Sequence, residues 1–212
     1  MYPHGYYNPG NLSNLNVCAC SLLQVLECNI IRIESLIIPL IWALWIMLPA
    51  YVPNPVAALL GGGTPIDLRK NYSDGNRIFG DGKTFRGLFF IILAGIVTGI
   101  FLIWIDNRFA FASLPQHTLL SVSLLATGAL LGDLVKSFFK RRFGMDRGTK
   151  WPVADQYDLV AGAFLLLLIG DPAWLFASVT LPVFLIILII TPVLHRATNI
   201  LGYMFRVKEV PW

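Results

Sequence analysis

Residues 118–142 read TLLSVSLLATGALLGDLVKSFFKRR, an apolar run that ends in one carboxylate and a group of cations. The run is long enough to cross a bilayer, and Asp133 lies where its apolar part gives way to Lys136 and Lys140. On a helix these three residues fall within one stripe about 100° wide. A carboxylate in the apolar core costs about 2.5–3.5 kcal/mol, so we expect Asp133 to have a function. The alternative is an interfacial aspartate paired with Lys136.

A second acidic cluster, Asp-Gln-Tyr-Asp at residues 155–158, begins the next apolar run. Asp155 and Asp158 are three residues apart, so they share one face of a helix. The helix dipole alone would account for one of these carboxylates. The uncharged residues 159–170 reach only about 18 Å, so a crossing must also include residues 154–158. Two carboxylates on one face are typical of hard-cation coordination and suit Mg²⁺ better than Zn²⁺.

The composition extends this apolar pattern to the whole chain. Of the 212 residues, 56% are hydrophobic and only 13% are charged, and the mean hydropathy is +0.68. Soluble domains carry about 25% charged residues. We therefore expect an all-α polytopic membrane protein with five transmembrane helices, at about residues 34–51, 88–105, 118–137, 154–170 and 174–195.

The basic residues indicate the orientation. If successive connections alternate sides, fourteen of the 16 Lys and Arg residues fall on one side, and only Arg32 and Arg108 fall on the other. This bias predicts an external N-terminus and a cytosolic C-terminus in the plasma membrane. The expected domains are an extracytoplasmic or interfacial tail, a catalytic domain with two cytosolic loops, and a cytosolic tail, at residues 1–33, 34–195 (loops 52–87 and 138–153) and 196–212.

The first predicted cytosolic loop contains residues of the types that bind phosphate. Residues 80–87 read GDGKTFRG, which places glycine backbone beside Lys83, Thr84 and Arg86, as in phosphate-binding nests. The segment is not a Walker loop, because that spacing requires a glycine where this chain has Arg77. The alternative is a flexible loop whose charges serve only to fix the topology.

These motifs together resemble those of the archaeal CDP-archaeol synthases. The similarity covers about residues 50–160, and it rests on Pro53-Asn54, Gly61-Gly62-Gly63, Pro65-Ile66-Asp67, the run from Asp81 to Gly87, Gly132-Asp133 with Lys140-Arg141, and the run from Asp155 to Asp158. The later half is also similar to the CDP-diacylglycerol synthases. The resemblance implies magnesium-dependent transfer of a cytidylyl group from CTP to 2,3-bis-O-(geranylgeranyl)-sn-glycerol 1-phosphate. The products would be unsaturated CDP-archaeol and pyrophosphate.

The resemblance and the residue types together give a set of candidate site residues. The candidate metal ligands are Asp133, Asp155 and Asp158, and with Lys140 they are also the candidate catalytic residues. The candidate substrate-binding residues are Asn54, Asp67, Asp81, Gly82, Lys83, Thr84, Arg86, Lys136 and Arg141. We expect Mg²⁺, with a second cation such as K⁺ as an option, and we expect CTP and an isoprenoid glycerol-phosphate lipid as substrates. No nucleic acid polymer is expected, and a homo-oligomer is an open alternative.

Two other classes of membrane protein fit parts of the pattern. The CDP-alcohol phosphotransferase signature also begins with Asp-Gly, as at Asp81, but it needs aspartates where this chain has Gly99 and Ile103. A transporter or ion channel could use the three aspartates as an ion or proton site. Such sites tend to lie near the membrane midplane between repeated halves. Here the acids lie at predicted helix ends and no repeat is visible, so we favour an enzyme.

Overall fold

The computed structural model describes residues 36–111, 113–146 and 148–206. The predicted tail at residues 1–33 therefore lies outside the described residues, as do Arg147 and residues 207–212. The chain divides into two units, Met1–Pro39 and Leu40–Trp212, and the packing below is that of the second unit.

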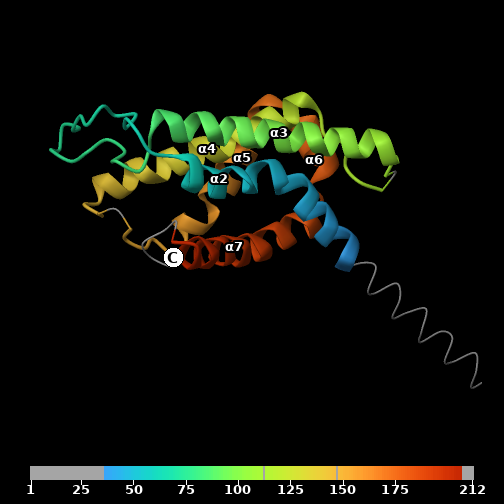
Figure 1. Ribbon diagram of the computed structural model, residues 1–212. Coiled ribbons are helices and arrows are strands. Elements are labelled where there is room, and N and C mark those ends of the chain that lie inside the picture. Colours follow the sequence, from blue (N-terminus) through green and yellow to red (C-terminus); the bar gives the residue numbers. More distant parts are fainter. Residues whose placement is uncertain (1–35, 112, 147, 207–212) are drawn as a thin grey trace, which may run out of the picture. The chain divides into compact units, whose positions relative to one another are not determined.

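The described part of the chain is helical, and its only other pairing consists of two isolated β-bridges (Figure 1). A helix at residues 36–51 leads into α2. The named helices are α2 (Pro53–Leu60), α3 (Phe85–Phe109), α4 (Leu119–Arg142), α5 (Ala154–Gly170), α6 (Pro172–Ser178) and α7 (Leu181–Met204). The prediction of an all-α fold is confirmed for this part of the chain.

Four of the described helical stretches are long and apolar enough to cross a membrane, namely Leu36–Leu60, Phe85–Phe109, Leu119–Arg142 and Leu181–Met204. The chain is therefore a multi-pass membrane protein. Helix α5 has the bounds expected for a fifth crossing, but it contains only 17 residues. At 1.5 Å per residue it reaches about 26 Å, less than the roughly 30 Å of a hydrocarbon core, so this crossing stays a prediction.

The predicted helix at residues 174–195 is wrong at its start and its end. The structure divides this region, because α6 ends at Ser178 and α7 begins at Leu181 and continues to Met204. Each of the two helices has a proline in its first turn. Proline is tolerated there because it lacks only an N–H that would have no partner inside the helix. An N-terminal proline therefore favours a new helix near residue 181.

Helix α4 packs against both α3 and α5, and glycines line both contacts. On the α3 side, a Cβ atom on Gly99 would lie 2.1 Å from Val122. On the α5 side, a Cβ on Gly132 would lie 2.0 Å from the carbonyl oxygen of Asp158, and a Cβ on Gly162 would lie 2.1 Å from that of Gly128. Small residues let helix backbones approach where lipid supplies no hydrophobic drive. The close crossing brings the two acidic motifs together.

The first and last parts of the α2–α3 loop, residues 61–84, lie side by side. Pro65 and Thr84 form an isolated bridge, and the amide of Ile66 donates a hydrogen bond of 2.8 Å to the carbonyl of Lys83. Thr84 is the N-cap of α3, where its hydroxyl accepts a hydrogen bond from the amide of Gly87 at 3.0 Å. The loop therefore delivers Lys83 directly to the start of α3.

Candidate functional site

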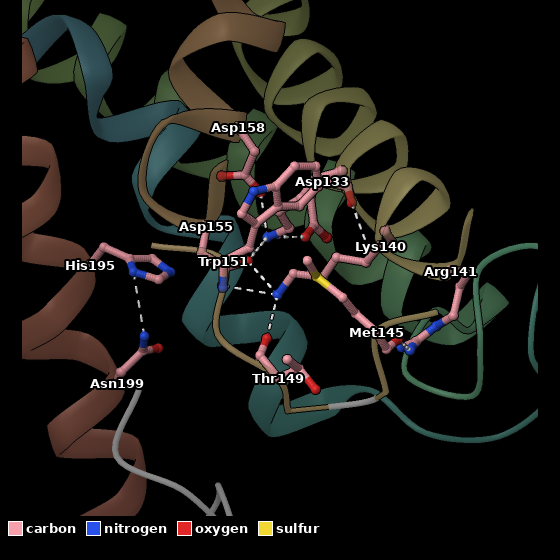
Figure 2. A network of polar contacts seen from close by, with 12 residues as sticks. Asp133, Lys140, Arg141, Met145, Thr149, Trp151, Asp155, Asp158, His195 and Asn199 are labelled. Atoms are coloured by element: carbon pink, nitrogen blue, oxygen red, sulfur yellow. Dashed lines mark hydrogen bonds and ion pairs between the residues drawn. The ribbon is translucent and has the colours of Figure 1, made fainter. Parts of the chain in front are cut away.

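The three predicted aspartates lie together where the C-terminal half of α4 meets the first turns of α5 (Figure 2). Among them lies Lys136 of α4. Its Nζ atom is 3.2 Å from Asp133 Oδ1, 3.6 Å from Asp155 Oδ1 and 2.6 Å from Asp158 Oδ2. The Asp158 and Asp133 side chains are only 4% and 10% exposed. The three carboxylates therefore converge on one positive charge in a largely buried place.

Two further lysines complete this network, which we call the aspartate–lysine cluster: Asp133, Asp155, Asp158, Lys83, Lys136 and Lys140. Lys83, from the α2–α3 loop, donates a hydrogen bond to Asp133. Lys140 Nζ is 2.6 Å from Asp155 Oδ1 and also donates to the carbonyl of Thr149 at 2.8 Å. The backbone amide of Trp151 donates to Asp155 Oδ2 at 2.7 Å. Opposite charges thus alternate from the α2–α3 loop through α4 to α5.

The oxygen atoms of this cluster are of the type that binds a hard divalent cation. Carboxylate oxygens are the ligands that Mg²⁺ prefers, and here three carboxylates surround a single point. Within the described residues, no group of three His, Cys, Asp or Glu side chains is placed to hold a metal, and the ammonium of Lys136 lies where the three carboxylates converge. In this arrangement the positive charge of Lys136 lies against the negative charges of the three carboxylates.

Asp67 organises the α2–α3 loop. Its side chain is fully buried, and its oxygens accept hydrogen bonds from Arg77 Nη2 at 2.6 Å and from the backbone amides of Gly80, Phe79 and Arg69 at 2.9, 3.1 and 3.1 Å. Burial alone would raise the pKa of this carboxyl group. The Arg77 guanidinium and the three amides outweigh burial and hold the pKa well below its usual range. Asp67, a predicted substrate-binding residue, therefore has its hydrogen-bonding partners inside the loop.

Arg142 fastens the outer part of the loop to the end of α4. Its Nη1 atom lies 2.8 Å from Asp74 Oδ1, and its Nη2 atom donates to the carbonyl of Asn76 at 3.2 Å. The guanidinium also stacks on Tyr72 and Phe138, at 4.7 and 5.0 Å from the ring centroids. One arginine thus ties the loop to α4 by an ion pair, hydrogen bonds and ring contacts.

Arg141, the neighbouring residue, contacts the returning part of the same loop. Its Nε atom donates to the carbonyl of Phe79 at 3.4 Å, and its Nη1 atom donates to the carbonyl of Met145. Gly80 has a φ of +89°, and a Cβ there would lie 2.8 Å from Arg141 Nε. Glycine therefore serves this position both through its backbone conformation and through the space it leaves.

The other predicted site residues lie outside the aspartate–lysine cluster. Asp81 is exposed and pairs with Arg77 at 2.8 Å, and Gly82 beside it is also exposed. Arg86 is exposed, with its guanidinium 5.8 Å from the centroid of Phe90. The structure brings together six of the predicted residues as that cluster. It leaves the rest on the α2–α3 loop or on the helices α2, α3 and α4, namely Asn54, Asp67, Asp81, Gly82, Thr84, Arg86 and Arg141.

The sequence prediction missed the residues that position the site. Gly128 and Gly132 form a Gly-x-x-x-Gly pattern, a recognised signal for close helix packing in membranes, and it was available from the sequence. Arg77 and Arg142 were counted only as topological charges. No sequence signal separates them from the other cations, since their partners lie far along the chain or on another element.

Comparison with known proteins adds to this geometry. Residues 33–212 match the model of the family described as CarS-like, CDP-archaeol synthase. The CDP-archaeol synthases of Methanoculleus marisnigri and Methanoregula boonei are 61% and 64% identical to this chain over 166 residues, which is 78% of this chain and 100% of each relative. A solved structure described as an intramembrane enzyme for archaeal membrane lipids biosynthesis has a TM-score of 0.61 and 33% identity, and the match covers 74% of this chain and 92% of the solved chain.

Proposed function

Because the chain belongs to the CDP-archaeol synthase family, we propose that it transfers a cytidylyl group from CTP to 2,3-bis-O-(geranylgeranyl)-sn-glycerol 1-phosphate, giving unsaturated CDP-archaeol and pyrophosphate. Members of this family are CTP-dependent cytidylyltransferases, so the protein is an enzyme of archaeal lipid biosynthesis and the transporter alternative is set aside. One observation carries the proposed site. Three carboxylates and three lysines form a largely buried network where helices of a membrane protein meet a polar loop.

The proposed reaction is a displacement at phosphorus. A phosphate oxygen of the lipid attacks the α-phosphorus of CTP, a new P–O bond forms, and the bond to the β-phosphate breaks so that pyrophosphate leaves with its electron pair. The nucleophile is already an anion, so no strong general base is needed. Catalysis then depends on positioning the reactants and on neutralising charge.

The cations of the site would bring these like-charged groups together. Lys83 and Arg86, with the hydroxyl of Thr84, would bind the triphosphate at the start of α3, where exposed Gly82 leaves the backbone accessible. Lys140 and Arg141, on α4, would bind the lipid phosphate or the departing pyrophosphate. Asp67 would act through the loop by holding the backbone beside Lys83 in place. Asn54 and Asp81 remain candidates for nucleotide contacts.

Asp133, Asp155 and Asp158 would hold Mg²⁺, and a second cation such as K⁺ would be compatible with this many carboxylates. When bound, the metal would neutralise phosphate charge. Lys136 pairs with all three carboxylates, two of which are almost inaccessible to solvent. Their pairing with Lys136 keeps the oxygens gathered in one place, and this convergence supports their assignment as metal ligands.

We place the reaction at the cytosolic face of the plasma membrane, with the N-terminus outside and α5 as a fifth, short crossing of the 34–195 catalytic domain. The uneven distribution of lysine and arginine supports this orientation. CTP would then arrive from the cytosol. The isoprenoid chains would stay in the bilayer, so the lipid phosphate would enter sideways between helices.

Replacement of Asp133 by asparagine tests the assignment. Purified Asp133→Asn should release pyrophosphate from CTP and lipid phosphate on the order of 10²–10³-fold more slowly, because one charged group of the site is lost. Gel filtration and the melting temperature would show that the variant is folded. Asp146→Asn is a matched control, since Asp146 is exposed on the connection between α4 and α5. Near-normal turnover of Asp133→Asn would contradict the site. Absence of CDP-lipid product from the wild type would contradict the function.

A further inference from the structure

Helix α7 contains a proline in its interior, and this proline leaves one carbonyl without its usual partner. Pro192 has no N–H group, so it cannot donate to the carbonyl of Leu188, four residues earlier. In water such a carbonyl would be solvated. In a bilayer it must find a partner within the protein.

The partner of this carbonyl comes from α5. The hydroxyl of Tyr157 donates a hydrogen bond of 2.9 Å to the carbonyl oxygen of Leu188. Tyr157 lies between Asp155 and Asp158, the two carboxylates that α5 contributes to the aspartate–lysine cluster. The hydrogen bond therefore joins the acidic turn of α5 to the proline site of α7.

Few other polar contacts hold α7 at this level. The buried residues of the helix are Val183, Ile187, Thr191 and Asn199, and the first three, which are four residues apart, follow one stripe. Within that stripe the Thr191 hydroxyl donates to the carbonyl of Ile187 at 2.6 Å. The hydroxyl of Tyr51, 2.6 Å from Thr191 Oγ1, is then the donor of the second bond. Tyr51 thus binds the same helix through the Thr191 side chain and not through the freed carbonyl.

We propose that Tyr157 is a positioning residue of the transfer reaction: through the carbonyl that Pro192 frees, it fixes the acidic turn of α5 against α7. This inference rests on the proposed function, since the turn carries two of the carboxylates assigned to the reaction. The role of the Tyr157 hydroxyl depends on the proline at residue 192. Tyr157 supplies the donor that the carbonyl of Leu188 lacks, and the carbonyl lacks it because residue 192 is proline. An ordinary residue at 192 would satisfy the carbonyl within α7 and make the hydroxyl dispensable.

A double-mutant cycle tests this dependence in the full-length protein, with kcat and the KM values for CTP and lipid phosphate measured for each folded variant. Tyr157→Phe removes only the hydroxyl, so kcat should fall by about tenfold through misplacement of the turn. The KM for CTP should stay within about twofold, because the basic residues proposed for the triphosphate lie on the α2–α3 loop and α3. In the Pro192→Ala background, whose new amide can donate to Leu188, the same replacement should change kcat by less than about twofold.

Tyr51→Phe is the matched control, because it removes a tyrosine hydroxyl bound to the same helix and should leave kcat unchanged. Wild-type kcat in Tyr157→Phe would overturn the proposal. So would an equal loss of kcat in Tyr157→Phe with and without Pro192→Ala. If Pro192→Ala does not fold, the comparison between Tyr157→Phe and Tyr51→Phe decides, and equal kcat values would overturn the proposal. A wild-type enzyme that makes no CDP-lipid would instead contradict the proposed function.

Discussion

The carboxylate of Asp67 shows how one buried charge can hold a loop of this enzyme closed. It accepts hydrogen bonds from Arg77 and from three backbone amides, and these keep its pKa well below the usual range despite burial. In the unfolded chain the pKa of this group would be about 3.9. Because the folded pKa is the lower one, ionised Asp67 stabilises the fold above about pH 4, and this contribution is lost as the pH falls further.

Asp67→Asn should therefore melt at a lower temperature than the wild type at pH 7, by a few degrees, since a charge-assisted network is lost. The difference should shrink as the pH falls below about 4, because Asp67 of the wild type then takes up a proton on unfolding, which stabilises the unfolded chain relative to the fold. Melting temperatures from pH 7 to pH 3 measure this. Arg77→Gln removes the charged partner of Asp67 and should weaken the pH dependence. A difference that is independent of pH would contradict this role of Asp67.

At the scale of single residues, the sequence predicted which side chains would lie together better than how they would pair. The spacing of Asp133 with Lys136 and Lys140 predicted one stripe of α4, and the structure brings these residues into one cluster. It did not predict that Lys136 would be shared by three carboxylates. Two of those carboxylates come from α5, and their distance depends on how two helices cross, which no local periodicity encodes.

At the scale of the elements, the crossing of α4 and α5 depends on glycine. A Cβ atom at position 132 would overlap the backbone oxygen of Asp158, and backbone cannot move aside as a flexible side chain can. The residue before Asp133 therefore sets the distance between the acidic motifs. Because Gly132 has no Cβ atom, the two helices can pack closely at this point.

Gly132→Ala should separate α5 from α4 and lower kcat by up to about 100-fold, because a shift of roughly 1 Å at a reacting centre has that effect. Pyrophosphate release per folded enzyme would measure it. Gly170→Ala is the control, since the atoms nearest to a Cβ there belong to the side chain of Leu124, with its two methyl carbons at 2.8 and 2.9 Å, and a side chain can move. Wild-type turnover in Gly132→Ala would show that the spacing of the helices does not control the site.

The sequence predicted the boundaries of a helix well where charged residues and the length of an apolar run limited the choice. The expected bounds of α5, residues 154–170, match the observed helix because the short apolar run had to recruit the acidic turn. The expected helix at residues 174–195 failed, since hydropathy alone joins α6 to α7. Prolines at the starts of both helices were the overlooked signal.

At the scale of the whole molecule, the distribution of charge predicts which side of the membrane each loop faces. The positive-inside rule places the α2–α3 loop in the cytosol and the connection between α3 and α4 outside. Ser73 lies exposed on the first and Ser113 exposed on the second. These two serines offer positions for a direct test of topology.

In a chain whose three native cysteines are replaced by serine, Ser73→Cys should react with a membrane-impermeant maleimide in inside-out vesicles only. Ser113→Cys should react in right-side-out vesicles only, because an odd number of crossings separates the two loops. Labelling yields in both vesicle types measure the topology. Reaction of both cysteines from the same side would contradict the proposed orientation.

Two of the ion pairs that hold the α2–α3 loop lie near the surface. Arg142 pairs with Asp74, and Arg77 pairs with Asp81, and the two aspartate side chains are 35% and 61% exposed. Dissolved salt weakens such pairs, since charges in water are screened over about 8 Å at physiological ionic strength. The glycine contacts between α4 and α5 carry no charge and are insensitive to screening. Ionic strength therefore acts on the proposed nucleotide loop while the helices that carry the carboxylates keep their spacing.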